Sequence, residues 1–304
     1  MTTISYVKKS RQKLWLAAIK PPMYSVAIIP ITMGGAVAFA QTNIFHQEIF
    51  FTFLGAAILI IAWLNLSNDV FDSETGIDKN KAESVVNLTG NKSLVFWLSN
   101  FLLGLGILGI ISIAWLQHDL TILGIVLLCC ALGYSYQGPP FRLGYQGLGE
   151  IICFFTFGPG AIAAAYYSQT KNFSLTSLAA SVIIGISTSI ILFCSHFHQV
   201  EDDLAAGKRS PIVRMGTTTG AKVLAWATGS LFAFTILFVL LKIFPVWTLL
   251  IFLSLPLAYR LVSHVWQHHD KPDLVRSSKF LAVNLHFISG MLLALGFVLP
   301  RFLS

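Results

Sequence analysis

Two short polar stretches, each closing a long apolar run, carry the side chains of this chain that could do chemistry. The first contains Asn68, Asp69 and Asp72 and continues to Asp78 and Lys79. Residues three and four apart share one face of a helix, so the first three are expected to point toward one mouth of a helix bundle. Hard oxygen ligands of this kind suit Mg²⁺, which usually joins carboxylates to the phosphates of a substrate.

The second stretch carries the same kinds of residue. On a regular helix His196, Gln199 and Asp203 share a face, whereas Glu201 and Asp202 point elsewhere. An Asp in mid-bilayer costs about 2.5–3.5 kcal/mol, so two acid clusters indicate a polar site rather than packing. Such a site could hold Mg²⁺ and clamp a diphosphate, which the metal makes a better leaving group. The basic residues close to these clusters are Lys79, Lys81, Lys208, Arg209 and Arg214.

A base beside this site could activate a hydroxyl group of a second substrate. The candidates for that catalytic role are Asp69, Asp78, His196 and His198. The sequence does not choose among them.

The rest of the chain predicts a multi-pass membrane protein. Of its 304 residues 55% are hydrophobic and 11% charged, and the mean hydropathy is +0.74, whereas soluble proteins carry about 25% charged residues. Apolar runs near the roughly 20 residues that span a bilayer recur nine times. We therefore expect an all-α fold with nine transmembrane helices in a ring around a central cavity, forming a single domain over residues 1–304. The expected spans are Pro22–Ala40, Ile49–Val70, Leu94–Trp115, Leu120–Gln137, Gly149–Ser168, Leu178–Gln199, Ala221–Leu241, Val246–Val262 and Phe280–Pro300.

The distribution of charge between the connections predicts the orientation. One side of the membrane receives 17 of the 20 Lys and Arg residues, and a basic tail over residues 1–20 is among its segments. The positive-inside rule makes that side cytoplasmic, and it also carries both polar stretches. The net charge of +7 is explained by topology and anionic lipid, so we expect no nucleic-acid partner.

The two polar stretches belong to a weak internal repeat, which we call the echo in the sequence. They end spans two and six, and each leads to a Ser that is followed six residues later by a Gly. The pairs are Ser84 with Gly90 and Ser210 with Gly216. This spacing favours two four-helix halves followed by a ninth helix, which would let the stretches meet over one cavity.

Several motifs of the chain resemble those of a known family. Asn68-Asp69-Val70-Phe71-Asp72, with Gly76 and Asp78, resembles the first aspartate-rich motif of the UbiA superfamily of intramembrane prenyltransferases. The stretch from His196 to Lys208 is similar to the second motif, and Tyr134 to Glu150 is similar to the loop between the fourth and fifth helices. The resemblance spans most of the chain. Within the family, the motifs are most similar to those of members that prenylate 1,4-dihydroxy-2-naphthoate. The sequence His-Phe-His-Gln is similar to that of members that transfer phytyl.

The resemblance implies Mg²⁺-dependent transfer of a phytyl or polyprenyl group from its diphosphate to 1,4-dihydroxy-2-naphthoate, with loss of diphosphate and CO₂, in phylloquinone or menaquinone synthesis. It also implies roles for particular residues. Asp72, Gln199 and Asp203 are expected to bind metal, and Asn68 to bind the metal–diphosphate. The other residues expected to contact diphosphate are Lys79, Tyr134, Arg142, Tyr145, Lys208 and Arg209.

The second motif departs from the commoner pattern, because Gln199 stands where many relatives carry Asp. Glu201 or Asp202 would compensate if the helix unwinds there, and the sequence leaves this open. It also leaves open homogentisate or 4-hydroxybenzoate as acceptor, the length of the tail, and a plasma or thylakoid membrane. A cation-coupled transporter is the alternative from another class, although such a protein should carry ionisable groups near mid-membrane.

Overall fold

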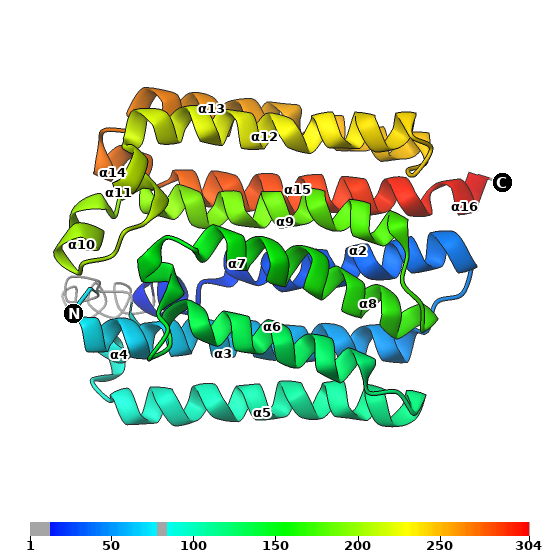
Figure 1. The fold of residues 1–304 in the computed structure, drawn as a ribbon, viewed down its shortest axis with the longest axis horizontal. Helices are drawn as coiled ribbons and strands as arrows, with labels where there is room; N and C mark the ends of the chain where they lie inside the picture. The colour runs from blue at the N-terminus through cyan, green and yellow to red at the C-terminus, as the bar shows by residue number, and fades with distance from the viewer. Residues whose placement is uncertain (1–12, 78–83, 304) are drawn as a thin grey trace, which may run out of the picture.

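The computed structural model describes residues 13–77 and 84–303, which form helices and short connections and contain no strand. The long helices run alongside one another (Figure 1). Each of the nine expected spans coincides with helical structure. Among the described residues, eight stretches are long and apolar enough to cross a membrane, and Thr121–Gln137 is apolar but shorter. The chain is thus an all-α, multi-pass integral membrane protein.

In chain order, the helices that correspond to the expected spans are α2 (Ser25–Thr42), α3 (Gln47–Thr75), α5 (Lys92–Gln117), α6 (Thr121–Gln137), α7 (Gly149–Phe155) with η3 (Thr156–Gly160) and α8 (Ala161–Thr170), α9 (Leu175–His196), α12 (Thr217–Leu240), η4 (Val246–Ser254) with α13 (Leu255–His268), and α15 (Ser278–Val298). The short helices are η1 (Pro21–Tyr24), α4 (Val85–Thr89), η2 (Leu143–Gln146), α10 (Val200–Ala205), α11 (Pro211–Met215), α14 (Pro272–Val275) and α16 (Pro300–Leu303).

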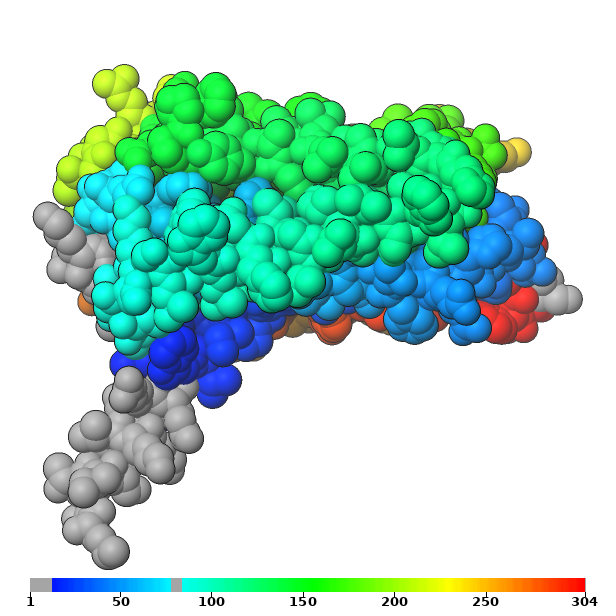
Figure 2. Space-filling view, turned by 90° about the horizontal axis from the view of Figure 1, so that it is seen from below, coloured from blue at the N-terminus to red at the C-terminus, as the bar shows by residue number. Residues whose placement is uncertain are grey.

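The outer surface of the bundle is apolar. Figure 2 shows the face on which α5 lies nearest the viewer. Trp97, Phe101, Leu108 and Trp115 of that helix are exposed. Apolar surface as extensive as this belongs against lipid rather than water. The opposite side of α5 approaches α3 closely, since a Cβ on Gly106 would lie 3.0 Å from a backbone oxygen of α3, as small residues allow in membrane bundles.

The helices contact one another in an order that closes on itself. α2 packs on α3, α6 on both α3 and α8, α7 on α9, α9 on α12, α12 on α13, α13 on α15, and α15 returns to α2. Further contacts join α2 to α8 and α9, and α15 to α9. The contacts thus form a closed circuit, but α2 also packs on α8 and α9, and α15 on α9, so the expected open ring is reproduced only in part. The large cavities lie toward one end.

The echo in the sequence is a repeat of structure. Ser84 precedes the five-residue helix α4, which ends at Gly90 with a φ of 64°. Ser210 precedes the five-residue helix α11, which ends at Gly216 with a φ of 78°. Glycine adopts positive φ without steric cost, so it can end a helix in this way. α4, α10, α11 and α14 all lie at the same end of the bundle (Figure 1), as expected for the connections after spans two, six and eight.

Candidate functional site

Two adjoining cavities lie at the end of the bundle that carries α10, α11 and α14. The first, which we call the polar cavity, has a volume of about 440 Å³ and is lined from α3, α6, α9, α10 and the start of α15. The second, the apolar cavity, has a volume of about 510 Å³ and is lined mainly by aliphatic side chains of η1, α2, α3, α7 and α9. The described residues that line both are Lys20, Asn68, Tyr136, Ser195, Gln199 and Lys279.

The first polar stretch reaches the polar cavity from the last turns of α3. Asn68, Asp69 and Asp72 all line it. Asp72 is 9% exposed, and its Oδ1 accepts a hydrogen bond of 2.6 Å from Nε2 of Gln137 on α6. That amide fixes the orientation of the carboxylate.

The second polar stretch reaches the same cavity, and the helix breaks within it, a possibility that the sequence left open. α9 ends at His196 and α10 begins at Val200. The intervening turn brings His198 and Gln199 to the cavity lining, and α10 adds Asp202 and Asp203. Of the two acids that the sequence left open, Asp202 lines the cavity, whereas Glu201 is exposed and does not. The break in the helix explains why Asp202 faces the cavity, because the turn changes the direction in which the side chains after it point.

Asp203 is the most deeply buried acid of the site, with no exposed surface. Lys208 Nζ lies 3.3 Å from its Oδ1, and His196 Nδ1 lies 3.3 Å from its Oδ2. Burial opposes ionisation of this carboxyl, but His196 and Lys208 outweigh burial and hold the pKa of Asp203 below its usual value. Both contacts are longer than the 2.7–2.9 Å typical of charge-assisted hydrogen bonds. Asp203 is therefore ionised at neutral pH and retains capacity to accept a further ligand.

His198 stands in a different environment. Burial is the largest influence on its imidazole, and the charges of Lys279 and Arg276 add to it, lowering the pKa of His198 to about 4. The ring is therefore neutral at pH 7 and can accept a hydrogen bond.

Asp69 lines the cavity, and each oxygen of its carboxylate already has a partner within the protein. Lys20 Nζ, just before η1, lies 3.1 Å from Oδ1. The backbone N–H of Val85, at the start of α4, donates to Oδ2 at 2.9 Å. Asp69 is 1% exposed. These contacts join three segments that are distant in the sequence.

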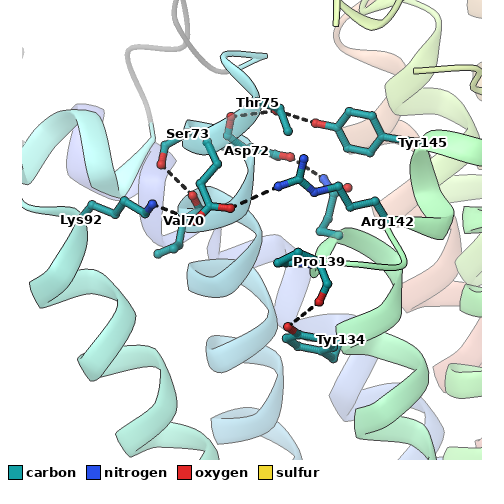
Figure 3. A network of polar contacts seen from close by, with 11 residues as sticks. Val70, Asp72, Ser73, Thr75, Lys92, Tyr134, Pro139, Arg142 and Tyr145 are labelled. Atoms are coloured by element: carbon teal, nitrogen blue, oxygen red, sulfur yellow. Dashed lines mark hydrogen bonds and ion pairs between the residues drawn. The ribbon is translucent and has the colours of Figure 1, made fainter. Parts of the chain in front are cut away.

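The loop after α6 lies beside the site rather than in its lining (Figure 3). Arg142 pairs with Glu74 on α3 at 3.2 Å. The hydroxyl of Tyr134 donates to the carbonyl of Pro139 at 2.8 Å, and its ring packs edge-on against Phe71. Tyr134, Arg142 and Tyr145 are not among the described residues that line either cavity.

Tyr145 joins the ends of the two polar stretches. Its hydroxyl lies 2.6 Å from Oγ1 of Thr75 at the end of α3. Its carbonyl accepts a 2.8 Å hydrogen bond from the backbone N–H of Arg209. The Arg209 side chain does not line the polar cavity, whereas Lys208 does. The remaining two site predictions, Asp78 and Lys79, fall outside the described residues.

Several cavity residues were missed by sequence reasoning. Tyr136 and Gln137 end α6, directly before Gly138-Pro139-Pro140, so their place at a helix mouth was a usable signal. Arg276 and Lys279 stand three apart at the start of the last apolar run, which is the spacing of one helix face. The missed residues of the polar cavity are Lys20, Ile77, Tyr136, Gln137, Ser195, Pro272, Asp273, Arg276 and Lys279.

The donor set suits a hard cation that is shared with a substrate. Asn68, Asp72, Gln199, Asp202 and Asp203 offer oxygen ligands around one cavity. Within residues 13–77 and 84–303, no three His, Cys, Asp or Glu side chains come close enough to cage a metal by themselves. Mg²⁺ is usually held by one or two carboxylates together with substrate phosphates and waters, so the residues fit a metal that arrives with an anion.

Comparison with known proteins gives a consistent result. The model of the UbiA prenyltransferase family matches residues 27–290. A 2-carboxy-1,4-naphthoquinone phytyltransferase of Synechocystis is 62% identical, over 94% of this chain and 93% of that protein. The chloroplastic protein of the same description from Arabidopsis thaliana is 45% identical, over 96% and 78%. A 1,4-dihydroxy-2-naphthoate octaprenyltransferase of Escherichia coli is 25% identical, over 94% and 97%.

Solved structures share the fold at low sequence identity. A UbiA homolog from Archaeoglobus fulgidus bound to GPP and Mg²⁺ is 15% identical with a TM-score of 0.59, and the match covers 95% of this chain and 99% of that one. A digeranylgeranylglyceryl phosphate synthase, also 15% identical, matches with a TM-score of 0.62 over 97% and 100%.

Proposed function

Because this chain belongs to the UbiA prenyltransferase family, we propose that it transfers a phytyl group from phytyl diphosphate to 1,4-dihydroxy-2-naphthoate. Diphosphate and CO₂ are the other products. The two relatives described as 2-carboxy-1,4-naphthoquinone phytyltransferases support this choice of donor and acceptor. The dihydroxy form is the acceptor, since an electron-rich ring is needed to attack an allylic carbon.

One observation carries the proposal. Both acidic stretches, which are more than 120 residues apart in the sequence, line a single polar cavity that adjoins an apolar one. A prenyl diphosphate has matching halves, with an anionic head and a hydrocarbon tail. A third apolar cavity of about 70 Å³ shares lining residues with the second and extends the apolar path along α3 as far as Phe53. The tail would lie along this path.

Asn68, Asp72 and Asp203 are the residues that would hold Mg²⁺ against the diphosphate, with Gln199 and Asp202 as further oxygen donors. The metal, when bound, stabilises negative charge on the departing diphosphate. Lys208, which is 5% exposed beside Asp203, supplies positive charge from the protein. Preorganised charge at a leaving group is commonly the largest contribution to rate.

The reaction balances without an oxidant or reductant. The C–O bond between the phytyl C1 and the diphosphate breaks, and its electron pair leaves with the diphosphate. A new C–C bond forms from the ring to C1. When attack occurs at the carboxyl-bearing carbon, the ring–carboxyl bond breaks as CO₂ leaves and its electrons return to the ring. The apolar cavity keeps water from the cation-like carbon.

We also propose roles for other residues around the site. His198 lines the polar cavity, where it would accept a hydrogen bond from an acceptor hydroxyl. Asp69 has contacts that suit a positioning residue for the end of α3. Arg142 and Tyr145 would reach a diphosphate only if the loop after α6 shifts. We propose that the site opens to the cytoplasm, because Lys and Arg concentrate on that side.

The decisive experiment uses purified protein in lipid with Mg²⁺, phytyl diphosphate and 1,4-dihydroxy-2-naphthoate. We expect release of diphosphate only when both substrates are present, a product of the mass of the decarboxylated phytyl adduct, and loss of both with a chelator. Asp72→Asn, whose fold is checked by thermal unfolding, should abolish turnover. Product from homogentisate or 4-hydroxybenzoate, and none from the naphthoate, would overturn the assigned acceptor.

A further inference from the structure

Lys279 occupies the place where the two cavities meet. It is one of six described residues that line both, and with Lys20 it is one of two among them that carry a positive charge. Lys20 is paired with Asp69 at 3.1 Å, on the side of the first acidic stretch. Lys279 comes instead from the first turn of α15, an element that carries neither acidic stretch.

Arg276 adds a second positive charge from the same part of the chain. It lines the polar cavity from the turn between α14 and α15, three residues before Lys279. Asp273 of α14 also lines the polar cavity but does not line the apolar one. Lys279 therefore supplies positive charge where the cavities meet, and Arg276 adds to it from the polar side, whereas the ends of α3 and α10 present acidic side chains. An anion has a favourable position beside these two cations.

The acceptor of the proposed reaction brings such an anion. The phytyl C1 joins the diphosphate to the tail, so it lies where the polar cavity meets the apolar cavity. The attacked ring must lie beside C1, and the carboxylate is attached directly to that ring. A carboxylate that leaves water for a partly apolar site needs a cation or several hydrogen bonds to offset its desolvation.

We propose that Lys279, with Arg276 adding to the field, binds the carboxylate of the naphthoate acceptor at the junction of the two cavities. This inference rests on the proposed function. It assigns the recognition of the acceptor carboxylate to Lys279 and Arg276, separately from the acids and Lys208 that are proposed to bind the donor.

The test compares two acceptors that differ only in the carboxylate, 1,4-dihydroxy-2-naphthoate and 1,4-dihydroxynaphthalene. With saturating phytyl diphosphate and Mg²⁺, Lys279→Gln should raise the KM of the carboxylated acceptor at least about tenfold, which is the size expected for one lost charge-assisted contact. The KM of the uncharged acceptor and that of phytyl diphosphate should change by less than about threefold. Where turnover of the uncharged acceptor is too slow to follow, its inhibition constant against the carboxylated acceptor replaces its KM.

Matched variants complete the design. Lys279→Arg should recover most of the affinity for the carboxylated acceptor, and Arg276→Gln should shift it in the same direction by a smaller factor. Lys222→Gln removes an exposed lysine at the start of α12 that lines neither cavity, and it should leave all constants unchanged. If Lys279→Gln does not fold, the Arg276→Gln and Lys279→Arg variants carry the same comparison.

Two results would overturn the inference. One is an equal effect of Lys279→Gln on both acceptors, and the other is a raised KM for phytyl diphosphate with that of the acceptor unchanged. A wild-type protein that does not prefer the carboxylated acceptor would also end it. Failure of the proposed function is separate, since the wild-type protein would then phytylate neither acceptor.

Discussion

His196 stands between two carboxylates, with Nδ1 3.3 Å from Oδ2 of Asp203 and Nε2 3.3 Å from Oε1 of Glu150. The imidazole is 2% exposed. Glu150 begins α7, His196 ends α9 and Asp203 lies in α10, so one ring ties three elements together. Residues that bond to a metal ligand and fix its orientation typically contribute a factor of 10–100 to metal affinity or activity.

We therefore expect His196→Gln to raise the Mg²⁺ concentration for half-maximal activity by roughly 10–100-fold. The KM for the acceptor should change little, because the contact acts through Asp203. A Mg²⁺ titration of diphosphate release at saturating substrates measures this. His264→Gln is the control, since His264 bonds to Leu274 and Ser277 on the exposed side of α13 and α14. Unchanged Mg²⁺ dependence in His196→Gln would show that the ring does not position Asp203.

Asp203 and Lys208 form a buried pair whose stability and activity effects can be separated. Asp203→Asn leaves Lys208 buried without its charge partner, which should lower the free energy of unfolding by about 3–5 kcal/mol. The double variant Asp203→Asn, Lys208→Met should recover much of that stability but little activity, with turnover still reduced on the order of 100-fold. Thermal unfolding in lipid and diphosphate release measure the two quantities. Recovery of full turnover in the double variant would remove Asp203 from the proposed metal site.

Asp69 is expected to matter for stability more than for proton transfer. Asp69→Asn weakens the contact with Lys20 and the hydrogen bond from Val85, at a cost of roughly 1.5–3 kcal/mol for hydrogen bonds to a charged group. Glu74→Gln is the matched control, because the pairs of Glu74 with Lys92 and Arg142 are partly exposed and should contribute less than about 1 kcal/mol. Unfolding midpoints compare the variants. If Asp69→Asn unfolds like the wild type yet loses all turnover, a direct catalytic role is the better account.

The lowered pKa of His198 predicts the direction of an acid effect. The pKa is about 4 in the folded protein and 6.5 in an unperturbed histidine. The stability that comes from the neutral ring is complete above pH 6.5 and is lost as the pH falls toward 4, because the unfolded chain then binds more protons. His198→Asn should show a smaller loss of unfolding temperature between pH 6.5 and pH 4.5 than the wild type. An identical loss would place the pKa of His198 near its ordinary value.

Much of this architecture was readable from residue types, because apolar length and charge placement are local properties. The nine apolar runs predicted the helices, and the spacing of Asn68, Asp69 and Asp72 predicted their common face. The turn after His196 was left open because no Gly or Pro marks it. Lys20 and Lys279 were missed because each is a single cation beside a long apolar run. Only tertiary packing brings such residues to the cavity.

For the loop containing Arg142, the sequence predicted contacts other than those in the structure. Its motif indicated contact with a diphosphate, whereas Arg142 pairs with Glu74 and Tyr134 bonds within its own turn. The sequence could not reveal these competing partners, since Glu74 is 68 residues away.

The junction between the cavities draws its lining from Lys20 near one end of the chain and from Lys279 near the other. During synthesis the first of these residues enters the membrane long before the second has been made. A nascent chain released before its last long helix therefore lacks one wall of this junction.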